Sequence, residues 1–273
     1  MLAIAGWQSA AGMHGVEERL DRLRSVAVRA RERGTQLLVT PEMHATGYEL
    51  TPEQLRERVD QDLIGPIRSI AAEAGLAMIV GSPVADGDRV YNGAVFINER
   101  GDVKATYRKS HLFGDLDRGL FHAGEEPFTM VEHHGVRIAM MICYDVEFPE
   151  TVRAASLAGA DIVIVPTAQM EPFDFVAESL IRTRAWENQI YVAYINHSGP
   201  ERDLTYVGKS SIVGPDARVI DSIDGGDGLI YAVIDTAEVA SAQATNPYLD
   251  DRQHHLYQGL IKPDHDRNLR NPT

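Results

Sequence analysis

Three residue types that can do chemistry together each follow an apolar segment that reads as a strand. They are Cys143, which is the only cysteine in the 273-residue chain, Glu42 and Lys109. Open α/β sheets place ligands and reactive groups just beyond the carboxyl ends of their strands. One sheet edge could therefore bring the thiol, the carboxylate and the ammonium to one place.

A thiol beside a carboxylate and an ammonium is suited to acyl transfer through a thioester. A cysteine thiol has a pKa near ~8.5, so it is mostly protonated at neutral pH and needs a general base. The Glu42 carboxylate could accept that proton, and Lys109 could stabilise the thiolate and a later oxyanion. Each residue also has a structural interpretation: Cys143 as a small buried apolar side chain, Glu42 as a helix-capping acid, and Lys109 as an exposed lysine.

Composition excludes several classes of function. The net charge of −14 argues against binding to nucleic acid or to an anionic membrane, because both need a basic face. No stretch approaches ~20 consecutive apolar residues, so no membrane span is expected. A single cysteine excludes an intramolecular disulfide and a zinc–cysteine site. The chain starts without a basic, signal-like segment, which favours a cytoplasmic location.

Strand-like and helix-like segments alternate along the chain, which predicts an α/β fold. Paired units in both halves indicate a single-domain α-β-β-α sandwich over residues 1–273, with 246–273 a C-terminal arm or a frayed terminus. The expected strands are 2–8, 36–40, 77–81, 90–97, 103–107, 136–143, 162–166, 190–196, 210–214, 218–222 and 229–234. The expected helices are 16–33, a region from 51 to 74, 150–158 and 175–188.

Three motifs in order give the chain a family resemblance. They are Pro41-Glu42-Met43-His44-Ala45-Thr46-Gly47-Tyr48, Tyr107-Arg108-Lys109-Ser110-His111-Leu112-Phe113 and Ile142-Cys143-Tyr144-Asp145-Val146-Glu147-Phe148-Pro149-Glu150. In content, order and separation they resemble the nitrilase superfamily of carbon–nitrogen hydrolases, over roughly residues 2–250. The details look most like the aliphatic amidase branch, which includes enzymes similar to 5-aminopentanamidase and stereoselective amino-acid amidases.

The resemblance implies roles for individual residues. Cys143 would be the nucleophile, Glu42 the general base and Lys109 the support of the oxyanion, together with the backbone N–H of Tyr144. The family often has a second glutamate before a Phe-x-x-Gly turn, and here Asp117 stands at that place. Asp117 could orient the substrate, or it could pair with Arg118 or another cation near the pocket mouth.

The resemblance implies a small amide and water as reactants, with no metal and no cofactor. Possible substrate-binding residues, besides Asp117 and Tyr144, are Glu147, Thr167, Phe173 and Asn196; Asn196 could equally hold a loop. Acidic side chains near the pocket would suit an ω-amino or guanidino amide, although Glu171 and Asp174 could instead cap a helix.

Other functions remain open at this point. A nitrilase or a carbamoyl-amide hydrolase would use the same triad, but nitrilases usually carry Trp-Glu where this chain has Tyr144-Asp145. An acyl-transferring relative and a non-enzymatic scaffold are further alternatives. By resemblance we expect a homodimer or larger homo-oligomer.

Overall fold

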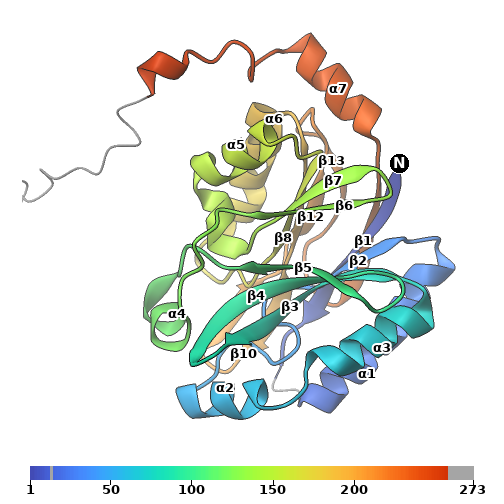
Figure 1. The fold of residues 1–273 in the computed structure, drawn as a ribbon, viewed down its shortest axis with the longest axis vertical. Coiled ribbons are helices and arrows are strands. Elements are labelled where there is room, and N and C mark those ends of the chain that lie inside the picture. The colour runs from blue at the N-terminus through green and yellow to red at the C-terminus, as the bar shows by residue number, and fades with distance from the viewer. Residues whose placement is uncertain (13–14, 258–273) are drawn as a thin grey trace, which may run out of the picture.

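Two β-sheets packed face to face form the centre of the structure, and helices cover their outer faces (Figure 1). This computed structural model describes residues 1–12 and 15–257. The expected α-β-β-α sandwich is confirmed. The part of the expected C-terminal arm beyond residue 257 lies outside the described residues.

The first sheet has the strand order β11-β10-β1-β2-β3-β4-β5, with β14 paired to β1. Strands β1, β2 and β3 run parallel, and β3, β4 and β5 are joined antiparallel. The bounds are β1 Leu2–Ala10, β2 Leu37–Val39, β3 Ala77–Asp86, β4 Arg89–Ile97, β5 Val103–Arg108, β10 His197–Glu201, β11 Leu204–Val207 and β14 Gly228–Ile234.

The second sheet has the order β13-β12-β9-β8-β7-β6, and its central strands β7, β8 and β9 are parallel. Strands β8 and β9 are buried on both faces and read as continuous apolar runs, as parallel strands do. The bounds are β6 Thr129–His133, β7 Val136–Met140, β8 Ile162–Pro166, β9 Tyr191–Ile195, β12 Ser210–Val213 and β13 Val219–Ile223.

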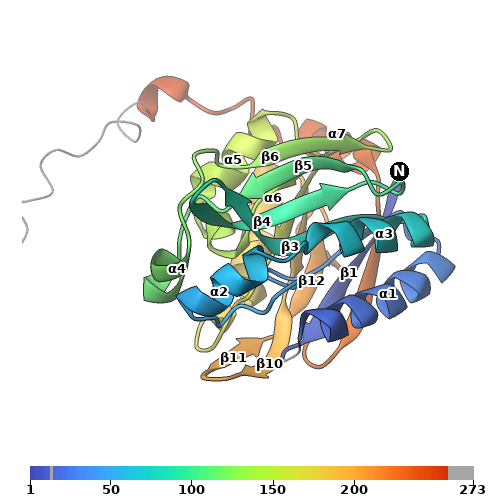
Figure 2. The ribbon, with the colours of Figure 1, turned by 60° about the horizontal axis from the view of Figure 1, so that its bottom comes forward.

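Helices α1 (Val16–Glu32) and α3 (Ile64–Ala74) lie side by side on the outer face of the first sheet (Figure 2). Helix α1 buries a stripe at helical spacing that includes Leu23, Val26 and Ala30. Helices α5 (Pro149–Leu157) and α6 (Ile181–Asn188) cover the second sheet (Figure 1). The remaining helices are α2 Pro52–Val59, α4 Gly114–Leu120, α7 Thr236–Thr245, and the short turns η1 Cys143–Glu147, η2 Val176–Leu180 and η3 His254–Leu256.

Alternation along the strands of the first sheet supplies two apolar layers. Ile4 and Ile79 point into the core between the sheets, whereas Ala5 and Met78, one residue away in each strand, pack under α1 and α3. The core between the sheets continues to Cys143 itself. The reactive positions are therefore anchored to the most buried layer of the protein.

Some element boundaries differ from the sequence expectation. The strand expected over 136–143 ends at Met140, and Cys143 opens η1. The helix expected over 175–188 is divided into the π-helical η2 and α6. Strands β6, β10 and β11 and helices α4 and α7 were not expected, because these short segments lack a strong apolar period.

Candidate active site

The chain turns sharply at Cys143, directly beyond the end of β7. Cys143 has φ of 44°, in the left-handed region that side chains other than glycine seldom adopt. Such strained backbone persists where the surroundings fix it, and it clusters at functional sites. The side chain is almost completely buried, with 8 % of the residue exposed. The turn thus holds the thiol in an almost fully buried position.

Glu42 follows β2 and is completely buried. Its Oε1 accepts a 2.6 Å hydrogen bond from Asn92 Nδ2, and its backbone N–H donates to the Thr167 carbonyl at 3.3 Å. His197 Nε2 lies 2.8 Å from the Glu42 carbonyl oxygen. The second carboxylate oxygen, Oε2, has no hydrogen-bond partner among the described residues. One side of the carboxylate is therefore held and the other can exchange a proton.

Lys109 lies between two buried carboxylates. Its Nζ is 2.8 Å from Glu42 Oε1 and 2.7 Å from Asp117 Oδ2, and all three side chains are completely buried. Asp117, on α4, also accepts from the Tyr48 hydroxyl at 2.7 Å and from the Phe113 N–H at 2.9 Å. The structure thus pairs Asp117 with Lys109 and not with Arg118, its neighbour in sequence.

Burial and mutual charge set the protonation states of this cluster. Burial raises the pKa of Glu42. The charge of Lys109 lowers that pKa, and the charge of Asp117 raises it further. Burial alone would lower the pKa of Lys109, but the Glu42, Tyr48 and Asp117 groups outweigh it and hold that pKa well above its ordinary value. Lys109 is therefore a fixed cation and not a proton donor.

The thiol is protonated in the resting site. Burial raises the pKa of Cys143 well above its usual value, and the charge of Glu42 raises it further, whereas Lys109 lowers it. The nucleophile therefore depends on a nearby base for activation. Of the groups around it, Glu42 combines a raised pKa with a free oxygen, Oε2.

Side chains beyond these four surround the sulfur. Cys143 Sγ donates to Gln169 Oε1 at 3.7 Å. The hydroxyls of Thr167 and Tyr194 are buried nearby, and a hydrogen bond with Thr167 lowers the pKa of Cys143 against the larger effect of burial. Burial is the main cause of the raised pKa of Tyr194, and the charge of Cys143 is the next. The Tyr194 hydroxyl therefore lies near the thiol.

Aromatic rings form a wall around Tyr144, the residue that follows Cys143. The Phe113 ring lies 5.1 Å from that of Tyr144 and 5.6 Å from that of Phe173, and Tyr144 lies 4.9 Å from Phe148, centroid to centroid. All are edge-to-face contacts, which favour a rigid arrangement. Phe173 is the exposed member of this aromatic wall.

Asp145 connects the cysteine turn to the loop that carries Lys109. Its carboxylate accepts from the Ile142 N–H at 3.0 Å, the Tyr107 hydroxyl at 2.8 Å and the Ser110 hydroxyl at 3.0 Å. It also accepts from the His111 N–H at 2.9 Å and lies 2.8 Å from His111 Nδ1. These contacts fix Cys143 and Lys109 relative to each other.

Comparison with known proteins identifies the family. The profile of the family described as "Carbon-nitrogen hydrolase" matches residues 3–244. The chain is a carbon–nitrogen hydrolase. It is 43% identical over 251 residues, covering 90% of this chain and 87% of the relative, to "Hydrolase in pqqF 5'region" of Pseudomonas protegens. An (R)-stereoselective amidase of a Pseudomonas species is 33% identical, with 80% of each chain covered.

Solved structures of an amidase from Nesterenkonia sp. AN1 resemble this hydrolase over almost its whole length. One has a TM-score of 0.85 at 34% identity and covers 96% of this chain and 100% of that chain. Another is of a variant of the same amidase and contains the acetamide moiety of fluoroacetamide covalently added at the active-site cysteine. It has a TM-score of 0.85 at 34% identity and covers 95% of this chain and 97% of that chain. The resemblance expected from the motifs is thereby confirmed.

The remaining predicted residues of the hydrolase take different positions. Asn196 is completely buried and holds a loop: its Oδ1 accepts from the Gln169 N–H at 2.9 Å and its Nδ2 donates to the Gly208 carbonyl at 2.8 Å. Glu147 is half-buried at the end of η1, and Arg184 Nη2 donates to its backbone carbonyl. Neither Glu171 nor Asp174 caps the following helix, where no side-chain cap is present.

Several site residues carried no role in the sequence reasoning. Tyr48 and Asp145 lie within the motifs that carry the family resemblance, so the signal was present without an assignment. Asn92, Gln169 and Tyr194 lie outside those three motifs, and only the fold brings them to Glu42 and Cys143.

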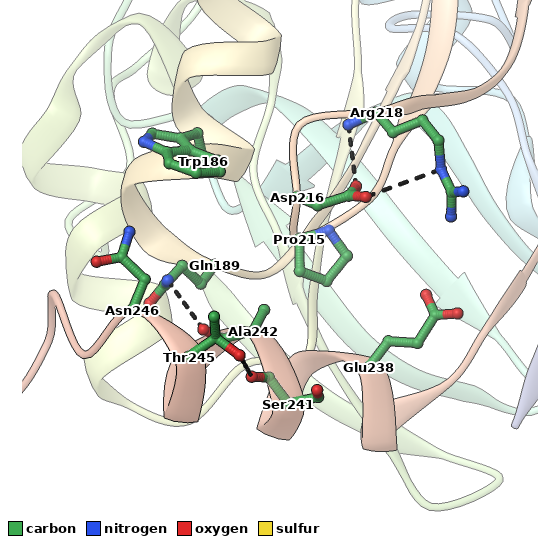
Figure 3. A pocket seen from close by; sticks show the side chains of 10 residues that line it. All are labelled: Trp186, Gln189, Pro215, Asp216, Arg218, Glu238, Ser241, Ala242, Thr245 and Asn246. Atoms are coloured by element: carbon green, nitrogen blue, oxygen red, sulfur yellow. Dashed lines mark hydrogen bonds and ion pairs between the residues drawn. The ribbon is translucent and has the colours of Figure 1, made fainter.

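A hollow of about 350 Å³ on the surface of the hydrolase lies apart from these residues (Figure 3). It is enclosed by α6, the turn between β12 and β13, and α7, whose Ala242 carbonyl accepts from Gln189 Nε2 at 3.1 Å. Arg218 and Asp216 pair with each other at its rim. The hollow contains none of the reactive groups described above.

Within residues 1–12 and 15–257, no three His, Cys, Asp or Glu side chains are arranged to hold a metal ion. In the same ranges no helix is both long and apolar enough to cross a membrane.

Proposed function

We propose that this hydrolase cleaves small linear aliphatic amides to carboxylate and ammonia through a thioester on Cys143. The observation that carries the proposal is the arrangement of Lys109, bound by Glu42 and Asp117, next to a buried thiol. Relatives named as amidases support it, among them a 2-oxoglutaramate amidase of Bacillus subtilis that is 32% identical, with 81% of this chain and 86% of the relative covered.

Acylation begins with transfer of the thiol proton to Glu42 Oε2. The Cys143 sulfur then forms a bond to the amide carbon, and the carbonyl oxygen becomes an oxyanion. Collapse of this tetrahedral intermediate breaks the C–N bond, and Glu42 returns its proton to the departing nitrogen, so ammonia leaves. A thioester between Cys143 and the acyl group remains.

Deacylation uses the same carboxylate. Glu42 accepts a proton from a water molecule as the water oxygen attacks the thioester carbon. The C–S bond then breaks, the sulfur recovers a proton from Glu42, and the acyl group leaves as the carboxylic acid, which ionises in water. The site is thereby returned to its starting protonation state.

Fixed positive charge stabilises the oxyanion in both steps. Lys109 keeps its proton because two carboxylates surround it, and the Tyr144 backbone N–H at the start of η1 is the second donor. Donors held in place in a buried site act without reorganisation during the reaction. Asp117 holds the Lys109 ammonium in position, which is the role we assign to it here.

The side chains around the thiol bear on which acyl group is accepted. The aromatic wall of Phe113, Tyr144, Phe148 and Phe173 offers apolar surface, and Thr167 adds a hydroxyl that is hydrogen-bonded to the thiol. Glu147 contributes a half-buried carboxylate whose pKa is raised by burial and lowered by Arg184 and Lys109. An acid beside aromatic rings suits an acyl chain that ends in an ammonium group.

We also propose that the protein assembles as a homo-oligomer in a reducing, cytoplasmic compartment, where a reactive thiol stays reduced. Leu157 of α5, Trp186 of α6 and Leu256 of η3 are exposed apolar side chains near the C-terminal segment. Such a surface favours burial against a second copy. Light scattering tests this proposal, and a monomer at all concentrations would contradict it.

Ammonia release tests the proposed reaction. The wild type and Cys143→Ala are compared on butyramide, 5-aminopentanamide, a carbamoyl compound and butyronitrile. We expect release from the amides by the wild type only. Release from the nitrile alone would favour a nitrilase, which is the second candidate, and activity retained by Cys143→Ala would exclude a thioester on that residue.

A further inference from the structure

Gln169 Oε1 accepts a hydrogen bond from the reactive sulfur, and neither mechanistic step above uses it. Its Oε1 lies 3.7 Å from Cys143 Sγ, and 6 % of the residue is exposed. The other end of the same amide, Nε2, donates to the Phe173 carbonyl at 3.2 Å. The side-chain orientation is thus settled, with the acceptor toward the thiol and the donor away from it.

The backbone of Gln169 is held on both sides. Its N–H donates to Asn196 Oδ1 at 2.9 Å, and its carbonyl accepts from Asn196 Nδ2 at 3.2 Å and from the Val207 N–H at 3.0 Å. Asn196 is completely buried at the end of β9. Gln169 therefore has little freedom to move its Oε1 away from the sulfur when a substrate binds.

A primary amide brings two N–H groups to the reacting centre, where Glu42 and Gln169 each present an acceptor oxygen. Glu42 has one free oxygen, which must exchange a proton with the departing nitrogen. The amide carbon must lie against Sγ to be attacked, so its nitrogen comes within reach of groups that surround the sulfur. Lys109 has only donors and cannot accept an amide N–H. A fixed, neutral acceptor beside the sulfur is what the second N–H requires.

We propose that Gln169 Oε1 accepts a hydrogen bond from the leaving –NH₂ group of the amide and so selects primary amides. The contact exists during acylation and disappears when ammonia departs, because the thioester has no N–H. Gln169 is then a specificity-determining residue for the leaving group. This inference rests on the proposed amidase function.

A pair of substrates with the same acyl group isolates this contact. Butyramide and methyl butyrate give the same thioester on Cys143 and the same deacylation step, but only the amide has N–H groups on its leaving side. We measure kcat/KM for both with the wild type, Gln169→Met and Gln169→Glu. Methionine has similar length without the acceptor, and glutamate keeps an acceptor at the same reach.

For Gln169→Met we expect kcat/KM on the amide to fall on the order of tenfold while that on the ester stays within about twofold. For Gln169→Glu the added charge affects both substrates, but the amide-to-ester ratio is expected to return toward that of the wild type. Ester hydrolysis by each variant shows in the same assay that the variant is folded.

Other outcomes would overturn the inference. An equal loss on amide and ester, complete loss included, would mean that Gln169 positions the thiol or the loop and does not contact the leaving group. An unchanged ratio in Gln169→Met would exclude the contact. A wild type that releases no ammonia from any amide defeats the proposed function instead, so the two failures are distinguishable.

Discussion

Lys109 Nζ contacts one oxygen of the Glu42 carboxylate at 2.8 Å and leaves the other without a hydrogen-bond partner among the described residues. The contact divides the two oxygens of one carboxyl group between two tasks. Oε1 is fixed by charge and by Asn92, and Oε2 is available for proton transfer. In the proposed mechanism Lys109 thereby determines which oxygen acts as the base, in addition to stabilising the oxyanion.

Asp117→Asn tests the electrostatic part of this arrangement. The Asp117 charge raises the pKa of Glu42, so its removal should lower that pKa and weaken the base. We expect kcat/KM to fall about a hundredfold and its acidic limb to move to lower pH. The pH profile of kcat/KM measures both effects, and Asp117→Glu should restore the profile. An unmoved acidic limb would contradict the role given to Asp117.

Asp145→Asn should uncouple the cysteine turn from the Lys109 loop. The variant leaves buried donors from Ile142, Tyr107 and His111 with a poorer acceptor, which we expect to lower the free energy of unfolding by about 2–4 kcal/mol and to reduce kcat as well. Urea unfolding and steady-state kinetics measure the two effects.

The matched control is Asp161→Asn, which removes a buried acid that accepts from the Arg137 N–H at the far end of β8. If both variants lose stability but only the control keeps kcat, the coupling is supported; full kcat in Asp145→Asn would refute it.

Gly81→Ala tests the close approach of β3 to the Glu42 loop. A Cβ at Gly81 would lie 2.2 Å from the Pro41 carbonyl oxygen and 2.8 Å from Glu42 Cα, both of them backbone atoms. The loop must therefore move, and we expect kcat/KM to drop at least about tenfold, because small displacements of catalytic groups are costly. Gly119→Ala, where a Cβ meets open space, is the control and should keep wild-type activity. Equal activity of the two variants would rule out the steric argument.

His197 should make the fold sensitive to acid. Burial lowers the pKa of His197 to about 4 from its ordinary 6.5. Below pH 6.5 the unfolded chain binds a proton that the folded protein does not, so stability is present above that pH and is lost as the pH falls toward 4. The loss from this residue is about 3 kcal/mol. In His197→Gln the free energy of unfolding, measured by urea between pH 7 and about 4.5, should depend less steeply on pH; an identical slope would show that His197 does not contribute.

The residues of the site that belong to local motifs could be predicted from the sequence. Glu42, Lys109 and Cys143 each follow a strand end, and the family profile and the fold agree with the resemblance drawn from those motifs. The paired sheets could be predicted because strand and helix periods alternate. What could not be predicted are contacts between distant segments, such as Cys143 with Gln169 and Asp145 with His111.

Short segments and polar partners account for most of the differences. β7 ends three residues before Cys143, because Cys143 must adopt a positive φ that no strand allows. The position of Asp117 near the site could be predicted by counting back from the Phe-x-x-Gly turn. Its ion pair with Lys109, in place of one with Arg118, depends on α4, which is too short to show a helical period in the sequence. Asn196 illustrates the same limit, since only tertiary structure separates a loop-holding amide from a substrate ligand.

The residues proposed as nucleophile and base belong to different sheets. Glu42 and Lys109 extend from β2 and β5 of the first sheet, whereas Cys143 extends from β7 of the second. The distance between sulfur and carboxylate is therefore set by how the two layers seat against each other, across a core that includes Phe96 and Ile138. The turnover rate therefore depends on the relative position of the two sheets. A core substitution far from the thiol that shifts one sheet by a fraction of an ångström would slow catalysis before the protein begins to unfold.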